Sequence, residues 1–296
     1  MQNFSIKDIE NLTGIKAHTL RIWEKRYNLI VSKRKDSKHR YFDNEDLKTI
    51  LRITYLYESE FKISQIAKLS KEAIISFAHI DHSNSKSIEA YILQLINALI
   101  EYDTENFQLI FKAGIKQFGF EKAMSELAYG LLRRIGLLWL TNHIIPAQEH
   151  FAANLIKNML INAIEEIPKS TIESTEEIIL FTPKGEHHEL PLLFANWLFK
   201  KNGRKTCYLG ANISIDELAY CTKKRKIDYL FFYLIANLTG KNITDYTAAL
   251  LNEFPSQTII DSGAQAKDIK INSPKLIKLK SLEELRSFPI NFKILE

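Results

Sequence analysis

The 296-residue chain has few of the residues that build disulfide-bonded or metal-clamped proteins. Its only cysteines are Cys207 and Cys221, which cannot make a disulfide framework or a Cys-x-x-Cys metal site. No apolar run reaches the ~18 residues that a membrane helix requires, and the first residues lack the apolar core of a signal peptide. We therefore expect a cytoplasmic protein with reduced thiols and no membrane partner.

Motifs of nucleotide-dependent enzymes are also missing. The chain has no Gly-x-Gly-x-x-Gly sequence after its first predicted strand and no Walker A sequence, so dinucleotide binding and ATP hydrolysis have no support. Hydrophobic residues make up 46% of the chain and charged residues 25%, which excludes wholesale disorder. The length indicates two or three domains at roughly 100–200 residues each.

The positive charge lies at one end of the chain. The net charge of +5 comes entirely from residues 1–70, which contain 14 Lys or Arg and 9 Asp or Glu, whereas the other 226 residues are neutral. Residues 16–40 alone contain nine basic and two acidic residues. A surface that follows DNA phosphates has such an excess, although on charge alone a solvated charged face explains it equally well.

The pattern around these charges favours a helix-turn-helix. Ser5 and Asp8 have the spacing of a capping box, and the apolar residues of 6–12 follow a helical stripe. Gly14 predicts a tight turn with positive φ, and a second short helix follows over 17–26. The side chains of that helix that we expect to point outward are His18, Thr19, Arg21 and Lys25.

A hairpin is expected after the second helix. Residues 33–42 are basic, have a turn-like centre at Asp36-Ser37 and return to aromatic residues, which predicts a β-hairpin wing. Cations on such a wing position the protein on phosphates and do not read bases.

Several short sequences of residues 1–70 match one pattern: Leu12-Thr13-Gly14-Ile15, residues 19–27, Arg40-Tyr41-Phe42 and residues 61–66. Together they resemble the MerR family of winged-helix transcription regulators. The resemblance implies contacts to DNA from Thr19 and Arg21 on the recognition helix and from Arg40 and Tyr41 on the wing. The full set of predicted DNA-binding residues is Lys16, His18, Thr19, Arg21, Lys25, Lys38, His39, Arg40 and Tyr41.

The middle of the chain is helical. After a polar linker at 80–86, four amphipathic segments are expected at about 87–102, 104–117, 120–142 and 146–167, which together predict a four-helix bundle. From 176 onward, short apolar strands alternate with helices, which predicts a doubly wound parallel sheet. The expected fold class is therefore α/β multidomain: a winged helix over 1–72, a bundle over 85–168 and a Rossmann-like domain over 175–296.

The Trp-Glu-Lys-Arg-Tyr sequence at 23–27 is similar to a subgroup of the MerR family whose C-terminal half binds cobalamin, the CarH/LitR type. In that subgroup an acid-x-His-x-x-Gly signature supplies the lower ligand of cobalt. Glu186 matches the acid and His188 the ligand, which makes His188 the predicted metal ligand. A charged helix start on the surface is the alternative explanation of these residues.

The same resemblance assigns residues around the rest of the cofactor. Trp139 is followed after nine residues by Glu149-His150, as in the subgroup's motif over the upper face of the corrin. A core tryptophan and a surface Glu-His pair would explain this spacing equally well. The complete set of predicted cofactor-binding residues is Trp139, Glu149, His150, Glu186, His188, Tyr233, Ser262 and Gly263.

The chain departs from the subgroup at four positions. Pro191 replaces the signature's glycine, Tyr233 replaces a serine beside the cofactor's tail, and Ser262-Gly263 replaces a Gly-Gly pair. Leu140 replaces the histidine that ligates cobalt in light-responsive members. These changes affect the tail pocket and the light response, whereas the lower ligand and its acid are kept.

Three functions remain in competition. The first is a non-enzymatic repressor that binds double-stranded DNA, with an oligomeric state (dimer or tetramer) and DNA affinity controlled by adenosylcobalamin or another cobalamin, and by light. The second is the same type of regulator with a degenerate site that senses a protein partner or another ligand. The third, a corrinoid carrier of a methyltransferase, is disfavoured because such carriers lack the basic winged helix.

Overall fold

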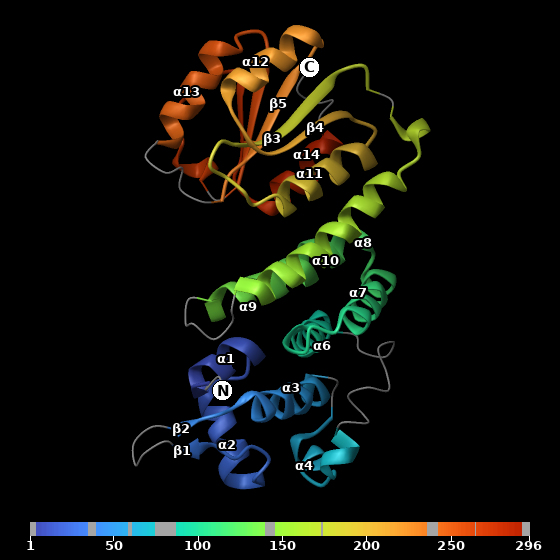
Figure 1. Ribbon diagram of the computed structural model, residues 1–296, viewed down its shortest axis with the longest axis vertical. Coiled ribbons are helices and arrows are strands. Elements are labelled where there is room, and N and C mark those ends of the chain that lie inside the picture. Colours follow the sequence, from blue (N-terminus) through green and yellow to red (C-terminus); the bar gives the residue numbers. More distant parts are fainter. Residues whose placement is uncertain are drawn as a thin grey trace. The chain divides into compact units, whose positions relative to one another are not determined.

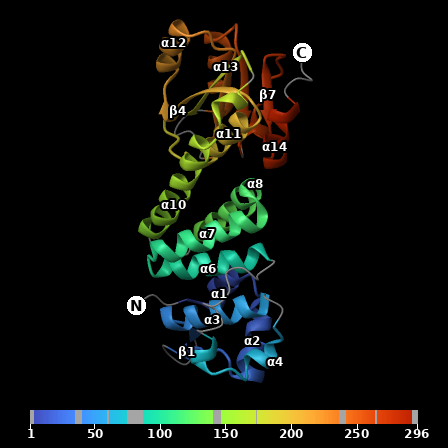
Figure 2. The ribbon, with the colours of Figure 1, turned by 90° about the vertical axis from the view of Figure 1, so that its right-hand side faces the viewer.

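The computed structural model describes residues 4–34, 40–58, 61–74, 87–139, 146–172, 174–235, 242–263 and 265–291 (Figures 1 and 2). The chain divides into two compact units, Met1–Leu155 and Ile156–Glu296. The boundary falls inside the long helix α10 (Pro146–Glu165). The expected linker at 80–86 lies outside the described residues.

The first unit begins with a winged helix. Its elements are α1 (Ile6–Thr13), α2 (Ala17–Tyr27), β1 (Lys33–Arg34), β2 (Arg40–Tyr41), α3 (Asn44–Glu58) and α4 (Ile63–Ile66). Strands β1 and β2 are antiparallel, and Phe4 and Phe42 form an isolated bridge beside them. The helix-turn-helix and the hairpin predicted from the sequence are thus confirmed, while the tip of the hairpin at 35–39 lies outside the described residues.

Local sequence explains why α1 begins and ends where it does. Ser5 accepts a hydrogen bond from the backbone N–H of Asp8, and the Asp8 carboxylate accepts one from the backbone N–H of Ser5, which is the predicted capping box. The helix ends at Gly14, whose φ of 74° is the left-handed conformation expected of it. Ile9 and Leu12 are buried on its inner face.

A helical bundle follows in the same unit. Its elements are α6 (Ile88–Ile100), α7 (Thr104–Phe118), α8 (Phe120–Lys122), the π-helical η1 (Ala123–Ala128), α9 (Tyr129–Trp139) and the start of α10. Asp103 caps α7 by accepting a hydrogen bond from the backbone N–H of Asn106. The bundle packs directly against the winged helix, since α1 contacts α9 and α3 contacts α6.

The second unit is built on a five-stranded parallel sheet. The strands are β3 (Glu177–Pro183), β4 (Lys205–Ile213), β5 (Tyr229–Tyr233), β6 (Thr258–Ser262) and β7 (Leu276–Leu279), in the order β4-β3-β5-β6-β7. The helices between them are α11 (Leu190–Lys201), α12 (Ile215–Lys224), α13 (Ile243–Glu253) and α14 (Leu282–Asn291). This arrangement confirms the predicted doubly wound α/β domain.

Helices cover both faces of the sheet (Figure 1). On one face, Leu218 of α12 and Leu250 of α13 pack against the apolar side chains of β3, β5 and β6. On the other face, Phe199 of α11 lies edge-on to Phe231 of β5, with ring centroids 5.3 Å apart. The strand order reverses between β3 and β5, so the carboxyl ends of these two strands form the switch point at which such sheets bind ligands.

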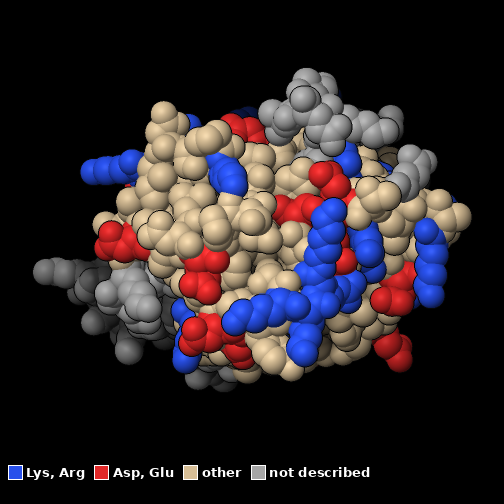
Figure 3. All heavy atoms as spheres, turned by 90° about the horizontal axis from the view of Figure 1, so that it is seen from above, with Lys and Arg blue, Asp and Glu red and all other residues tan. Residues whose placement is uncertain are grey.

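The surface drawn in Figure 3 carries Lys and Arg side chains interspersed with Asp and Glu. Such mixing fits the neutral balance of the 226 residues after residue 70. None of the helices in the described part of the chain is both long and apolar enough to cross a membrane.

Candidate functional site

The second helix of the helix-turn-helix presents its cations outward. Leu20 and Trp23 are buried, whereas His18, Arg21 and Lys25 are exposed and Thr19 is partly exposed. Because buried and exposed residues alternate with the helical period, the predicted recognition residues share one outer face of α2.

The turn between α1 and α2 is fixed by Glu10. Its carboxylate accepts a hydrogen bond from the backbone N–H of Ala17 (3.2 Å) and pairs with Lys16 (3.1 Å). The hydrogen bond from Lys16 lowers the pKa of Glu10. Glu10 therefore caps the start of α2 and holds Lys16, a predicted DNA contact, beside the turn.

The wing is held by acidic side chains on the helices. Glu24 of α2 accepts a hydrogen bond from the backbone N–H of Ser32 (3.0 Å) and pairs with Arg40 (3.1 Å). Lys33 pairs with Asp43 and with Asp46 (3.0 Å), and the hydrogen bond from Lys33 is the main cause that lowers the pKa of Asp43 to about 2. The base of the wing is thus anchored to both α2 and α3.

Two of the predicted wing contacts remain accessible. Arg40 is exposed despite its pairing with Glu24, and Tyr41 is partly exposed. The other two, Lys38 and His39, lie outside the described residues.

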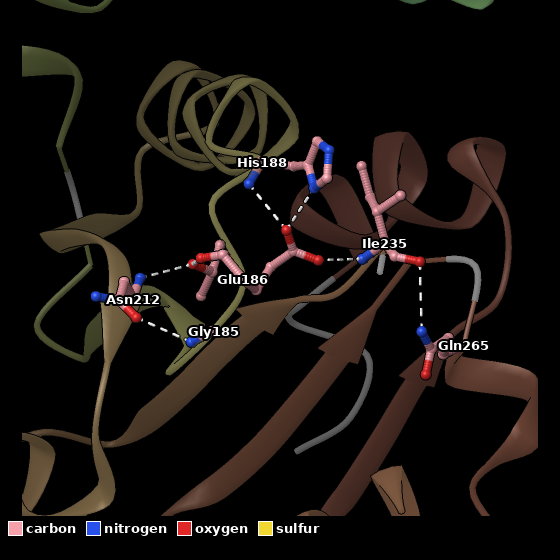
Figure 4. Close-up of polar contacts among 7 residues, drawn as sticks. Gly185, Glu186, His188, Asn212, Ile235 and Gln265 are labelled. Carbon is pink, nitrogen blue, oxygen red and sulfur yellow. Dashed lines mark hydrogen bonds and ion pairs between the residues drawn. The ribbon is translucent and has the colours of Figure 1, made fainter. Parts of the chain in front are cut away.

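A second site lies at the carboxyl ends of β3 and β5, where Glu186 is the central residue (Figure 4). Its side chain is 1% exposed. One carboxylate oxygen accepts hydrogen bonds from the backbone N–H of His188 (2.9 Å) and lies 2.5 Å from Nδ1 of the same residue. The other oxygen accepts a hydrogen bond from the backbone N–H of Ile235, after β5 (2.9 Å).

This geometry orients the His188 imidazole. The side chain of His188 is 55% exposed, while Nδ1 is engaged by the buried carboxylate of Glu186. A carboxylate on one ring nitrogen fixes the tautomer and leaves the other nitrogen, Nε2, as the donor for a metal.

The loops around Glu186 are joined to one another (Figure 4). The side-chain amide oxygen of Asn212, near the end of β4, accepts a hydrogen bond from the backbone N–H of Gly185 (2.9 Å). Gln265, after β6, donates to the backbone carbonyl of Ile235 (3.3 Å). Four strand ends therefore contribute to one hydrogen-bonded framework around the histidine.

Glu189, next to His188, connects this loop to other elements of the second unit. Its carboxylate accepts a hydrogen bond from the hydroxyl of Tyr208 on β4 (2.8 Å) and pairs with Lys157 of α10. Burial is the main cause that raises the pKa of Tyr208. The histidine loop is thus held on both sides, by Glu186 and by Glu189.

The residues predicted beside the cofactor's tail lie on β5 and β6. Tyr233 is partly buried and Ser262 is buried, and the two are paired in the register of the sheet. Gly263 has a φ of 124°, and a Cβ there would lie 2.3 Å from the carbonyl oxygen of Leu234. Only glycine fits this position, so the retained half of the Gly-Gly pair has a structural reason.

Asp261, beside Ser262, is a buried carboxyl that sequence reasoning missed. It is 1% exposed, and its Oδ2 has no hydrogen-bond partner among the described residues. Lys278 is its register partner on β7, but the ammonium donates to the carbonyls of Ile269 and Ile271. Burial raises the pKa of Asp261 to about 7, and burial followed by the charges of Asp261 and Glu186 raises that of Tyr233 to about 12.

Pro191 does not disrupt the helix that follows His188. It lies in the first turn of α11, where a missing N–H costs no helical hydrogen bond. The replacement of the signature's glycine is therefore compatible with the fold of this loop.

The remaining predicted residues belong to the first unit. Glu149 is partly exposed and His150 exposed in the first turns of α10, and Trp139 is the last residue of α9. The side chain of Trp139 and residue Leu140 lie outside the described residues.

Several connecting residues had no clear sequence signal. Glu24 was visible only as one of two acids in the basic segment 16–40, Glu10 only as an acid of the first predicted helix, and Glu189 only as a neighbour of the histidine. A charged residue inside the apolar strand 258–262 was the one signal that could have identified Asp261.

The donor set fits a corrinoid. One exposed imidazole backed by a buried carboxylate could supply one nitrogen ligand to the cobalt of a corrinoid, and Gly263 allows a close approach to the backbone carbonyl of Leu234. The partly buried Tyr233 and the buried Asp261 lie on the neighbouring strands β5 and β6.

Comparison with known proteins finds two family matches, one over the winged helix and one over the helical bundle. Residues 4–73 match the MerR HTH family regulatory protein model, and residues 91–162 match a B12 binding domain. Two curated relatives come from Myxococcus xanthus. The HTH-type transcriptional repressor CarH is 20% identical over 260 residues, or 86% of each chain, and the HTH-type transcriptional repressor CarA is 24% identical over 210 residues, or 70% of this chain and 68% of CarA.

Among solved structures, the monomethylamine corrinoid protein of Methanosarcina barkeri has a similar fold. The match has a TM-score of 0.54 and 13% identity and covers 70% of this chain and all of the other, which shows likeness of fold alone. Residues 4–73 therefore match a MerR-type helix-turn-helix, residues 91–162 match a B12 binding domain, and over most of its length the chain is similar to two transcriptional repressors.

Proposed function

We propose that this protein is a transcription repressor that binds double-stranded DNA and whose oligomeric state and DNA affinity are controlled by a cobalamin. The single observation that carries the proposal is the Glu186–His188 pair. A buried carboxylate 2.5 Å from Nδ1 leaves a half-exposed imidazole at the switch point of the sheet, in a chain that begins with a helix-turn-helix.

The DNA-binding half is supported by the outer face of α2 and by the anchored wing. His18, Thr19, Arg21 and Lys25 lie on one face of α2, in position to enter a major groove. Lys16 beside the turn, and Arg40 and Tyr41 on the wing, would bind the flanking phosphates. Lys38 and His39 belong to this proposal through the family resemblance.

In the part of the proposal that concerns cobalamin, residues at the carboxyl edge of the sheet and residues of the bundle have separate roles. His188 would give its Nε2 to cobalt, and Glu186 would hold the ring. Tyr233, Ser262 and Gly263 would lie beside the tail, and Trp139, Glu149 and His150 would cover the opposite face. A bound cobalamin supplies a cobalt centre that accepts an imidazole nitrogen.

Control of DNA binding would follow from assembly. A ligand that binds one oligomeric state better than another shifts the equilibrium toward that state. Because joined DNA-binding domains bind a repeated site more tightly than single ones, a change from monomer to dimer or tetramer changes the DNA affinity without altering the recognition residues.

The test is a titration of the full chain with adenosylcobalamin, followed by absorbance and by size-exclusion mass, in wild type and in His188→Ala. We expect wild type to take up cofactor, to change its absorption band and to change its mass. His188→Ala should lose the band shift that axial histidine produces. A wild-type protein that takes up no cobalamin at millimolar excess would contradict the proposal.

A second candidate function is a DNA-binding regulator whose cobalamin site is degenerate, and the residues at the ends of β5 and β6 favour it. Tyr233 stands where the subgroup has a smaller serine, and the buried carboxyl of Asp261 lies on the neighbouring strand, which suits a regulator that senses another ligand or a protein partner. A wild type that binds its promoter DNA but no cobalamin would favour this candidate.

A further inference from the structure

A side chain of the bundle contacts the turn of the helix-turn-helix. Arg134, on α9, donates a hydrogen bond from Nη1 to the backbone carbonyl of Leu12 (3.0 Å), 122 residues away in sequence. Its guanidinium also pairs with Glu89 of α6, and the Arg134 side chain is only 14% exposed. Burial lowers the pKa of Arg134 to about 10, which leaves it charged at neutral pH.

The acceptor of this bond is one that the helix itself cannot satisfy. Leu12 lies in the last turn of α1, where carbonyls have no intrahelical N–H partner. A cation there also interacts favourably with the helix dipole, yet the last turn of α1 contains no basic residue of its own. Arg134 therefore acts as the C-terminal cap of α1, supplied by another domain.

The Arg134–Glu89 pair lies directly against the turn. A Cβ built at Gly14 would lie 3.3 Å from Oε1 of Glu89 and 3.4 Å from Nη2 of Arg134. On the other side of Gly14, Glu10 caps the first N–H of α2 at Ala17. The end of α1 and the start of α2 are thus each held by a side chain, one from the bundle and one from α1.

We propose that Arg134, together with Glu89, is a positioning residue for DNA binding: through this pair the helical bundle sets the turn of the helix-turn-helix and so the orientation of α2. The inference rests on the proposed DNA-binding function. If Arg134 and Glu89 have this role, the helical bundle contributes to DNA binding together with the winged helix. Arg134 and Trp139, a proposed cofactor residue, both belong to α9.

The chain offers a matched control on the same helix. Arg133 precedes Arg134 and is exposed, so Arg133→Ala removes the same charge without touching the turn. Arg134→Lys keeps the positive charge but replaces the planar two-sided donor by a single ammonium. These variants separate loss of charge from loss of the cap.

The experiment uses the full chain with a fluorescent DNA fragment from the promoter of its own operon. DNA affinity is measured over a series of salt concentrations, and backbone amide exchange is followed by mass spectrometry for residues 6–27. We expect Arg134→Ala to weaken DNA binding at least tenfold at unchanged salt dependence and to speed exchange at the turn. Arg134→Lys should be intermediate, and Arg133→Ala should stay within twofold of wild type.

Each other outcome counts against the inference. An Arg134→Ala protein with wild-type affinity and wild-type exchange at the turn would overturn it. The inference would also be overturned if the slope of log affinity against log salt concentration fell by about one unit in Arg134→Ala. Arg134 would then itself contact a phosphate. Faster exchange throughout α11 as well would show general destabilisation in place of local positioning. If wild type binds no DNA, the proposed function fails and the role of Arg134 in DNA binding fails with it, while exchange at residues 12–17 still tests whether Arg134 holds the turn.

Discussion

The winged helix and the carboxyl edge of the sheet both depend on acidic side chains, but they place them at different depths. Glu24, which anchors the wing through Arg40, has a side chain 21% exposed, and its partner is 54% exposed. Glu186, which holds His188, is 1% exposed. Asp261, one strand further along, is equally buried but has an oxygen without a partner in the described part of the chain.

This difference separates two uses of a carboxylate. A half-exposed ion pair is screened by water and contributes about 0–1 kcal/mol, so it orients a cation without holding it firmly. A buried carboxylate must be satisfied by several donors or must take up a proton, so its effects are larger. The first suits a surface that exchanges its partners for phosphates, and the second suits a fixed ligand site.

The largest effect is expected at Asp261. Its pKa is raised to about 7 from 3.8, so the folded state binds a proton that the unfolded state releases, and stability falls as pH rises between these values. Asp261→Asn removes this cost. The stability gain of the variant over wild type should therefore grow by about 2–3 kcal/mol between pH 5 and pH 8.

Urea unfolding of both full-length proteins at the two pH values measures this gain. Glu253→Gln, an exposed carboxyl on α13, is the matched control and should show no such growth. A gain for Asp261→Asn that is equal at pH 5 and pH 8 would contradict the assignment of a raised pKa.

The second-largest effect is expected on cobalamin affinity, at Glu186, the buried carboxylate that does have hydrogen-bond partners. Glu186→Gln keeps the shape of the side chain but cannot accept from both Nδ1 of His188 and the two backbone N–H groups as a charged group does. We expect cobalamin affinity to fall about 10–100-fold, as for other residues that support a ligating histidine. Titration followed by absorbance measures it, with Glu176→Gln as control; equal affinity in Glu186→Gln and wild type would refute the role.

On the DNA-binding face, Arg21 should have a smaller effect. It is exposed on α2 beside His18 and Lys25. Arg21→Ala should weaken binding to promoter DNA by about tenfold, the lower part of the range for a base or phosphate contact. Fluorescence anisotropy at fixed salt measures it, and Arg133→Ala serves as control. A change of less than twofold would remove Arg21 from the interface.

The smallest effect is expected at Glu24. Glu24→Gln removes the half-exposed pairing with Arg40 but keeps an acceptor for Ser32, so stability should fall by no more than about 1 kcal/mol. Thermal unfolding checks this value. A loss as large as that at a buried carboxylate would erase the contrast between the two regions.

Local patterns were sufficient for the elements and for part of the site. The strands and helices of the second unit follow runs of apolar residues and their caps. Glu186 and His188 were assigned by the family resemblance, and they lie close together because they share one short loop. The capping box of α1 and the left-handed Gly14 were predictable for the same reason.

Contacts between segments far apart in the chain could not be predicted from the sequence. Ile235 donates to Glu186 only because β3 and β5 are neighbours in the sheet, and Arg134 caps α1 only because α9 packs on it. The burial of Asp261 likewise depends on the helices over β6 and on β7. The predicted boundaries at 72, 85, 168 and 175 stay a prediction, and the compact units meet within α10.

The proposed function depends on coupling between a cobalamin held by His188 and DNA binding in one chain. The most direct test measures the affinity of wild type and of His188→Ala for promoter DNA in the dark, with and without saturating adenosylcobalamin. We expect cobalamin to change the DNA affinity of wild type at least tenfold and that of His188→Ala by less than twofold. Equal DNA affinities of wild type with and without bound cobalamin would contradict it.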